Sequence, residues 1–355
     1  MLALQNVFYY TLRSIVTQKG VSRYMNKLKY VIAYTLLIIV DPLGVQASTF
    51  LSETPPNFKI AFIADQGLGK NAEAVLKLIK SEGAQAVLHQ GDLDYKNNPS
   101  AWEAQIDRIL GEDFPYFASI GNHDIKEWYG KNGYQEYLKN RLNRLGIKWN
   151  GDLGVKSSIR YKGIFIILVA PGEVGYHHDV YIRDQLVGDK SIRRICSWHK
   201  NMQLMQLGGK KDDTGWGVYE AARKGGALII TAHDHSYGRT YPLSNFVNQT
   251  ITSHSNRIVI TEGRTFAFLS GTGGAGIHEQ KLEEPWWAKV YTKTQHATYG
   301  ALFGVFNVDG VPNKAMFYFK NIHGEVIDHF NVTSTIHNNL LHKENQQRKT
   351  HEIHS

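Results

Sequence analysis

The chain has 355 residues, of which 42% are hydrophobic and 20% are charged, as expected for a globular protein with a real core. Its formal net charge is +8, but residues 1–47 carry five basic residues and one acidic residue, so half of the charge lies outside the expected domain. A nucleic-acid binder needs a basic face on the domain itself, so no nucleic-acid partner is expected. The single cysteine, Cys196, excludes an intrachain disulfide and a cysteine-rich zinc site.

The N-terminal leader, residues 1–47, has the pattern of a signal peptide. Two lysines precede an apolar run, and the small residues Val45 and Ala47 occupy the −3 and −1 positions of a cleavage site. The run is shorter than the ~20 residues that a membrane-spanning helix needs. We therefore expect a secreted or extracytoplasmic protein, with Met25 as an alternative start. A membrane partner is expected only if the leader is retained as an anchor.

Strands and helices alternate in the first part of the chain. Short apolar runs that end at polar or glycine-containing turns predict strands, and apolar residues on one face predict helices. The expected strands cover 58–64, 86–89 and 116–120, and the expected helices cover 71–80, 100–110 and 134–145. We expect Asn71 to cap the first helix, and Ser100 and Glu103 to form a capping box at the second.

Strands dominate the second part of the chain. The expected strands cover 164–170, 192–198, 227–232, 257–262, 265–269, 299–308, 314–320 and 326–332, with one helix over 214–224. Because helices are scarce after 232, the later strands are expected to be antiparallel. The whole pattern predicts one α/β layered domain with a mixed sheet over 48–334. Residues 335–355 are polar and His-rich, and they predict a disordered tail.

Metal-competent side chains follow five of the expected strands, just past their C-terminal ends. They are Asp65, Asp92, Asn122, His199 and His233. In open α/β sheets, ligands bind in the crevice outside these ends. Chance does not favour one such residue at each of five strand ends, so we expect a functional site there.

Three short motifs sharpen this expectation. In Gly-Asp-x-x-Tyr the carboxylate of Asp92 can bridge two cations, and Tyr95 can curl back to the same place. In Gly-Asn-His-Asp the glycine permits a tight bend, the Asn amide oxygen can bind metal, and His123 is free for substrate. In His-Asp-His the rings of His233 and His235 project the same way from an extended backbone, so each can reach a different metal.

The order of these motifs resembles that of the calcineurin-like metallophosphoesterases, and Tyr95 is similar to the purple acid phosphatase branch in particular. The resemblance covers residues 57–332 and includes the segments 232–240, 270–276 and 306–310. It implies a four-layer α/β/β/α sandwich with two mixed β-sheets and a strand-rich C-terminal half. Many members have a His where this chain has Gly67, a difference that the Tyr-ligand branch explains because Tyr95 would take the place of that His.

The resemblance also implies a binuclear centre with Asp92 shared by two metals. The first metal, Fe(III), would be held by Asp65, Asp92, Tyr95 and His235. The second, Fe(II), Zn or Mn, would be held by Asp92, Asn122, His199 and His233. Hard oxygen ligands suit a trivalent ion, and imidazole suits a divalent one.

The implied reaction is hydrolysis of a phosphate monoester by a metal-bound hydroxide. His123 would contact the phosphate and protonate the leaving group, and Asp124 would orient its ring. The expected partner is a small phosphorylated substrate. The segment after His199 supplies none of the further substrate-contacting His residues that some members have, so the substrate range stays open. A phosphodiesterase or nucleotidase with the same metal cage, and a non-catalytic surface binding protein, remain as alternatives.

Overall fold

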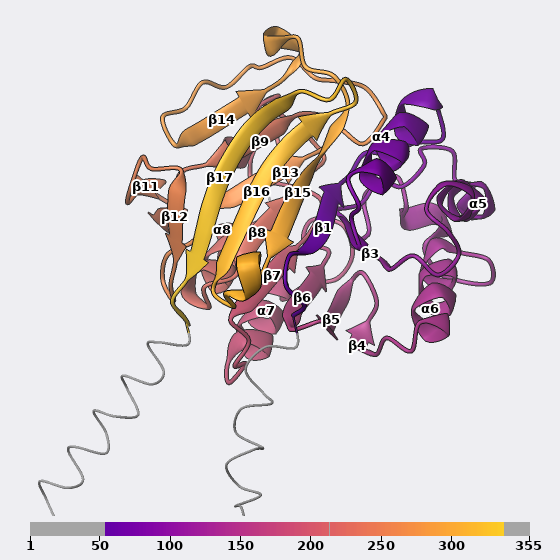
Figure 1. Cartoon of the computed structure of the whole chain (residues 1–355), viewed down its shortest axis with the longest axis horizontal. Helices are drawn as coiled ribbons and strands as arrows, with labels where there is room; N and C mark the ends of the chain where they lie inside the picture. Colours follow the sequence, from indigo (N-terminus) through magenta and orange to yellow (C-terminus); the bar gives the residue numbers. More distant parts are fainter. Residues whose placement is uncertain (1–53, 213, 337–355) are drawn as a thin grey trace, which may run out of the picture. The chain divides into compact units, whose positions relative to one another are not determined.

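Two large β-sheets form the centre of the computed structural model, which describes residues 54–212 and 214–336 (Figure 1). The predicted leader and nearly all of the predicted tail lie outside these residues. Among the described residues, no helix is both long and apolar enough to cross a membrane. Both sheets are mixed, as the resemblance implied.

The first sheet has seven strands in the order β12-β17-β16-β15-β1-β2-β3. Their bounds are β1 Phe58–Ile63, β2 Ala86–His89, β3 Tyr116–Ala118, β12 Arg257–Ile260, β15 Gly300–Phe306, β16 Lys314–Asn321 and β17 Val326–Ser334. Strands β1, β2 and β3 are parallel to one another, whereas β15, β16 and β17 form an antiparallel meander that joins β1. The parallel part brings the carboxyl ends of three strands to one edge.

The second sheet has eight strands in the order β14-β9-β13-β8-β7-β6-β5-β4. Their bounds are β4 Trp149–Asp152, β5 Lys156–Tyr161, β6 Ile164–Val169, β7 Arg193–Ser197, β8 Leu228–Thr231, β9 Tyr237–Thr240, β13 Ala267–Ser270 and β14 Trp287–Tyr291. Strands β6, β7, β8 and β13 are parallel, and the outer strands are antiparallel. A separate hairpin pairs β10 Leu243–Asn245 with β11 Thr250–Ile251.

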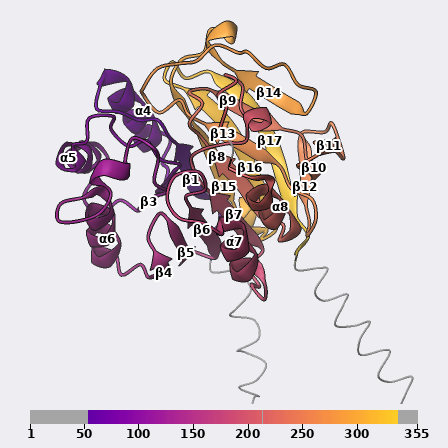
Figure 2. The ribbon, with the colours of Figure 1, turned by 180° about the vertical axis from the view of Figure 1, so that it is seen from behind.

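Helices lie beside both sheets and complete the predicted α/β/β/α sandwich. The helices are α4 Lys70–Ser81, α5 Pro99–Ile109, α6 Tyr134–Arg144, α7 His178–Leu186 and α8 Trp216–Lys224. The first three gather beside β1 and β3 of the first sheet (Figure 1). The view from behind shows α7 and α8 over the second sheet (Figure 2). The predicted fold class is therefore confirmed.

Two predicted helix caps are wrong. Helix α4 is capped by Gly69 without a side-chain bond, so Asn71 lies inside the helix. Helix α5 begins earlier than the predicted capping box, because Pro99 fixes the first helical turn and the Asn98 side chain accepts a hydrogen bond from the Ala101 amide at 3.1 Å. A proline at the first position needs no amide partner there.

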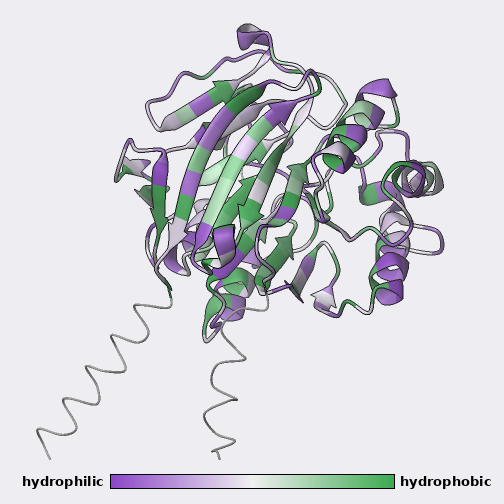
Figure 3. Ribbon diagram, viewed as in Figure 1, coloured by the Kyte–Doolittle hydropathy of each residue, from purple (hydrophilic) through white to green (hydrophobic). Residues whose placement is uncertain are grey.

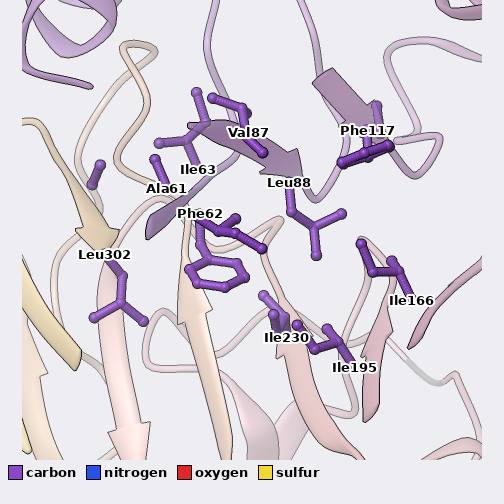
Figure 4. Close-up of a cluster of buried hydrophobic side chains, with 14 of the residues drawn as sticks. Ala61, Phe62, Ile63, Val87, Leu88, Phe117, Ile166, Ile195, Ile230 and Leu302 are labelled. Atoms are coloured by element: carbon purple, nitrogen blue, oxygen red, sulfur yellow. The ribbon is translucent and has the colours of Figure 1, made fainter. Parts of the chain in front are cut away.

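The main core lies between the two sheets. Figure 4 shows apolar side chains of β1, β2, β3 and β15 facing those of β6, β7 and β8. Phe62 packs edge-on against Phe268 of the opposite sheet, with ring centroids 5.5 Å apart. Along β17, hydrophobic residues alternate with hydrophilic ones (Figure 3), since one face meets the core and the other meets solvent.

A buried ion pair also joins the two sheets. Arg239 on β9 donates to Asp328 on β17 through Nε at 2.7 Å, and Tyr237 donates to the same carboxylate at 2.8 Å. The guanidinium also lies 4.3 Å from the ring centroid of Phe330. A buried charge is tolerated when it is paired and hydrogen-bonded, so Arg239 holds the sheets together.

Candidate metal centre

The residues predicted from five strand ends converge at the edge where the carboxyl ends of both sheets meet. They are Asp65 after β1, Asp92 after β2, Asn122 after β3, His199 after β7 and His233 after β8. The two sheets are joined at this edge, because Ser119 Oγ donates to the Ser197 carbonyl at 2.9 Å. The loops of two sheets can therefore supply ligands to one small volume.

Backbone strain accompanies this convergence. Four of the predicted ligands have left-handed backbone torsions, namely Asp65 (φ 55°), Asp92 (φ 60°), Tyr95 (φ 59°) and His233 (φ 66°). Non-glycine residues seldom adopt this region, and such strain gathers at functional sites.

Two glycines let the loops approach closely. A Cβ atom on Gly121 would lie 2.2 Å from the Asp92 backbone nitrogen and 2.3 Å from Asp92 Oδ1. One on Gly91 would lie 2.9 Å from Nδ1 of His199. Only glycine leaves room for these contacts, which explains the glycine that precedes Asp92 and the one that precedes Asn122.

Asp65, Tyr95 and His235 form the first cluster. The Tyr95 hydroxyl donates to Asp65 Oδ1 at 2.8 Å, and its oxygen lies 2.9 Å from Nε2 of His235. That Nε2 atom is also 3.4 Å from Asp65 Oδ1. The other oxygen, Oδ2 of Asp65, is buried and has no hydrogen-bonding partner in the described part of the chain. This set offers carboxylate, phenol and imidazole ligands to one ion.

Asp92, His199 and His233 form the second cluster. Asp92 Oδ2 lies 3.2 Å from Nε2 of His199, which lies 3.1 Å from Nδ1 of His233. One ligand atom from each of these residues lies within 4.8 Å of the others. Oδ1 of Asn122 is buried and lacks a hydrogen-bonding partner among the described residues.

The orientation of His199 indicates that a cation belongs in this cluster. Its Nδ1 atom lies 2.8 Å from the Gln90 carbonyl. A carbonyl only accepts, so Nδ1 carries a hydrogen, and Nε2 presents a lone pair whenever it carries no proton. That lone pair faces the Asp92 carboxylate and a ring nitrogen of His233. Acceptors that face one another need a proton or a metal ion between them, so the residues fit a metal.

The pKa shifts of the site residues also indicate that the site attracts a positive ion. Burial, and then the charges of Asp65 and Asp92, raise the pKa of Tyr95, so the phenol keeps its proton until a cation is bound. Burial opposes the charged form of His199, but the Asp92 carboxylate raises its pKa to about 10. Burial and the charge of His199 lower the pKa of His233 to about 4. The buried carboxylates thus attract positive charge, and one ring remains neutral.

His123 lies at the exposed side of the site, where the sequence predicted a substrate contact. Its ring centroid is 4.6 Å from that of Tyr95, and its backbone amide donates to Asp92 Oδ1 at 2.9 Å. Asp124 does not have its predicted role. Its buried carboxylate accepts hydrogen bonds from the amides of Asp92, Leu93 and Gly121, each at 2.8 Å, in place of the His123 ring.

Two residues near the centre were not predicted as site residues. His278 stacks on His235, with centroids 4.3 Å apart and an angle of 6° between the rings. Glu173 has a side chain that is 1% exposed, and its Oε2 atom lies 3.7 Å from Lys200 Nζ. For His278, the glycine-rich segment that precedes it is a sequence signal that could have identified the residue. Glu173 lies in no sequence motif.

Two solved structures share this fold at low sequence identity. The fold is similar to that of purple acid phosphatase PPD1 from yellow lupin (Lupinus luteus) seeds, with a TM-score of 0.58 and 15% identity over 79% of this chain. The match covers 55% of the lupin chain, so this chain corresponds to about half of that protein. The fold is also similar to that of GAP50, the anchor in the inner membrane complex of Plasmodium, with a TM-score of 0.51 and 12% identity over 78% of this chain and 88% of that one.

No curated protein matches the chain by sequence. The model of the calcineurin-like phosphoesterase family, however, matches residues 58–237. This range makes up half of the chain and includes every predicted metal ligand. The chain therefore belongs to the calcineurin-like phosphoesterase family.

Proposed function

We propose that this protein is a binuclear metal-dependent phosphatase that hydrolyses phosphate monoesters and belongs to the purple acid phosphatase-like branch of its family. The main support is the pair of ligand clusters. Asp65, Tyr95 and His235 form one, His199 and His233 form the other with Asp92, and all lie at one edge of the fold. Membership of the branch rests on Tyr95, because the family fold alone does not require a phenol ligand.

The donor sets suit two different ions. Asp65, Asp92, Tyr95 and His235 would hold Fe(III), since carboxylate and phenolate oxygens favour a hard trivalent cation. Asp92, Asn122, His199 and His233 would hold Fe(II), Zn or Mn. When bound, two such ions polarise the phosphoryl group and lower the pKa of a water molecule that attacks phosphorus.

His123 would supply the proton that the leaving group needs. Its backbone is tied to Asp92 and its ring rests on Tyr95, while the side chain stays open to solvent. A protonated imidazole at this place can donate to the departing ester oxygen as the P–O bond breaks. The proton then returns to the ring from solvent, which completes the cycle.

The metal cage does not by itself distinguish a monoester from a diester substrate. The preference for a monoester rests on the likeness to the purple acid phosphatases. Secretion of the protein is a separate proposal, and it rests on the leader sequence alone.

The test is hydrolysis of an aryl phosphate monoester and the matching diester across pH, by protein loaded with iron plus zinc or manganese. The variant Asp92→Asn should lose most bound metal and nearly all turnover, whereas the exposed Asp184→Asn serves as a matched control. Turnover of the diester alone would move the assignment to a phosphodiesterase. Two bound metals without turnover of either ester would favour a non-catalytic binding protein.

A further inference from the structure

A loop over 207–212 is fastened to the segment that carries His233. The backbone amides of Leu207 and Gly208 both donate to Oδ2 of Asp234, each at 2.8 Å. Lys210 Nζ donates to the His233 carbonyl at 2.6 Å. The loop is remote from His233 in sequence, and these contacts hold it against the strained backbone of that residue.

Asp212, at the end of this loop, faces the His233 ring. Its Oδ2 atom lies 3.0 Å from Nε2 of His233, and the two side chains are 20% and 10% exposed. This is a close polar contact, but it is not a regular hydrogen bond. Oδ2 is buried and has no regular hydrogen bond to any described residue. A hydrogen on Nε2 of His233 would place a donor beside this oxygen.

The two nitrogens of His233 have opposite surroundings. Nδ1 faces His199 Nε2 at 3.1 Å, inside the second ligand cluster. Nε2 faces a carboxylate, which can only accept. A neutral imidazole has one N–H group, and a carboxylate beside Nε2 favours the tautomer that carries the hydrogen there. Nδ1 is then left with its lone pair directed into the cluster.

We propose that Asp212 is a positioning residue for the second metal, because it holds His233 in the tautomer that binds metal through Nδ1. The proposal rests on the binuclear centre proposed above. It completes a pattern at the second cluster, where the Gln90 carbonyl fixes the opposite tautomer of His199. The two rings would thus bind the same ion through different nitrogens, each set by its own acceptor.

The first experiment measures the affinity of zinc for the second site by chelator competition, in protein that already holds iron at the first site. Loss of a carboxylate behind a metal-binding His typically weakens affinity about 10- to 100-fold. We expect Asp212→Ala to show this loss, Asp212→Asn to show a smaller one, and the exposed neighbour Lys211→Gln to match the wild type. The visible band of the iron site should be unchanged in all three. Unchanged zinc affinity in Asp212→Ala, or loss of both metals together, would overturn the proposal.

A second experiment needs no metal. Long-range ¹H–¹⁵N spectra of metal-free protein labelled at histidine should show His233 with its hydrogen on Nε2, and Asp212→Ala should shift the ring toward the other tautomer. An unchanged tautomer would contradict the role of Asp212 even if two metals bind. Conversely, a wild-type protein that binds no second metal would refute the binuclear centre, whatever the tautomer.

Discussion

The carboxylate of Asp124 supports the backbone of Asp92, because its Oδ2 atom accepts a hydrogen bond from the Asp92 amide at 2.8 Å. The same oxygen accepts from the Gly121 amide at 2.8 Å. One buried side chain therefore ties together the loops after β2 and β3. Asp92 has a left-handed backbone, and this contact helps to hold it there.

The first prediction concerns Asp124→Asn. The amide group of Asn would place a donor against backbone donors, so at least one buried bond would be lost. Leaving a buried backbone donor without its acceptor costs about 1–3 kcal/mol, and we expect a loss of stability of about that size together with weaker metal binding. Urea unfolding of the metal-free protein measures the first effect. Asp113→Asn, at an exposed acid, should change little, and equal stability of the two variants would refute the supporting role.

The second prediction concerns Gly121→Ala. The new methyl group would meet the Asp92 backbone nitrogen at 2.2 Å, so Asp92 would have to move. Overpacking of this kind costs about 1–3 kcal/mol, and the displaced carboxylate should bind metal poorly. Gly69→Ala is the control, because its methyl group would meet no atom within 4 Å. We expect it to cost less than about 1 kcal/mol, through the weaker cap alone. Full metal content in Gly121→Ala would contradict this account.

The candidate ligands could be proposed from the sequence because five of them follow a strand end and the others stand in short motifs with one of these five. An apolar run in the sequence identifies a strand, and the end of that strand marks the position where a metal ligand can lie. The contacts behind the ligands could not be read. Asp212 lies in a loop without a sequence motif, and only the course of that loop brings it to His233. Glu173 is brought close to the ligands by the turn after β6.

The missed elements have equally local reasons. Strand β4 is short and mostly exposed, so it has no apolar run. Helix α7 follows His177, which has a left-handed backbone and makes no side-chain cap, so the helix has no start signal.

The expectation of antiparallel strands late in the chain holds for β15, β16 and β17. It is wrong for β12, which pairs in parallel with β17, and holds only in part for β13, which pairs in parallel with β8 and antiparallel with β9. Such pairing depends on tertiary contacts.

The third prediction concerns Tyr95→Phe. If the phenolate binds Fe(III), the iron-loaded wild type should have a visible charge-transfer band and the variant should not. The fold should be retained, because the lost hydroxyl bonds to Asp65 and His235 contribute about 1 kcal/mol each. Absorption spectra of iron-loaded protein provide the measurement. Tyr129→Phe removes a hydroxyl that donates to Asp152 at 2.7 Å away from the ligands, and it should keep the band. A band that survives in Tyr95→Phe would exclude this ligand.

The fourth prediction concerns the pH dependence of stability in metal-free protein. Burial raises the pKa of Glu173 from 4.5 to about 7, and the charges of His199 and Lys200 offset only part of this effect. Between these two values the folded state binds more protons at Glu173 than the unfolded state does. Stability contributed by this residue therefore falls as pH rises through that window, by about 3 kcal/mol in total.

Glu173→Gln removes this titration, so the variant should lose less stability than the wild type between pH 5 and pH 8. Urea unfolding at several pH values in that range, after removal of metals by a chelator, provides the comparison. Glu283→Gln, at an exposed position, should keep the wild-type slope. Bound cations near His199 would favour the charged carboxylate, so the difference between Glu173→Gln and wild type should shrink in the metal-loaded protein. Equal slopes for Glu173→Gln and wild type without metal would show that the carboxylate is hydrated, and that its burial does not govern its charge.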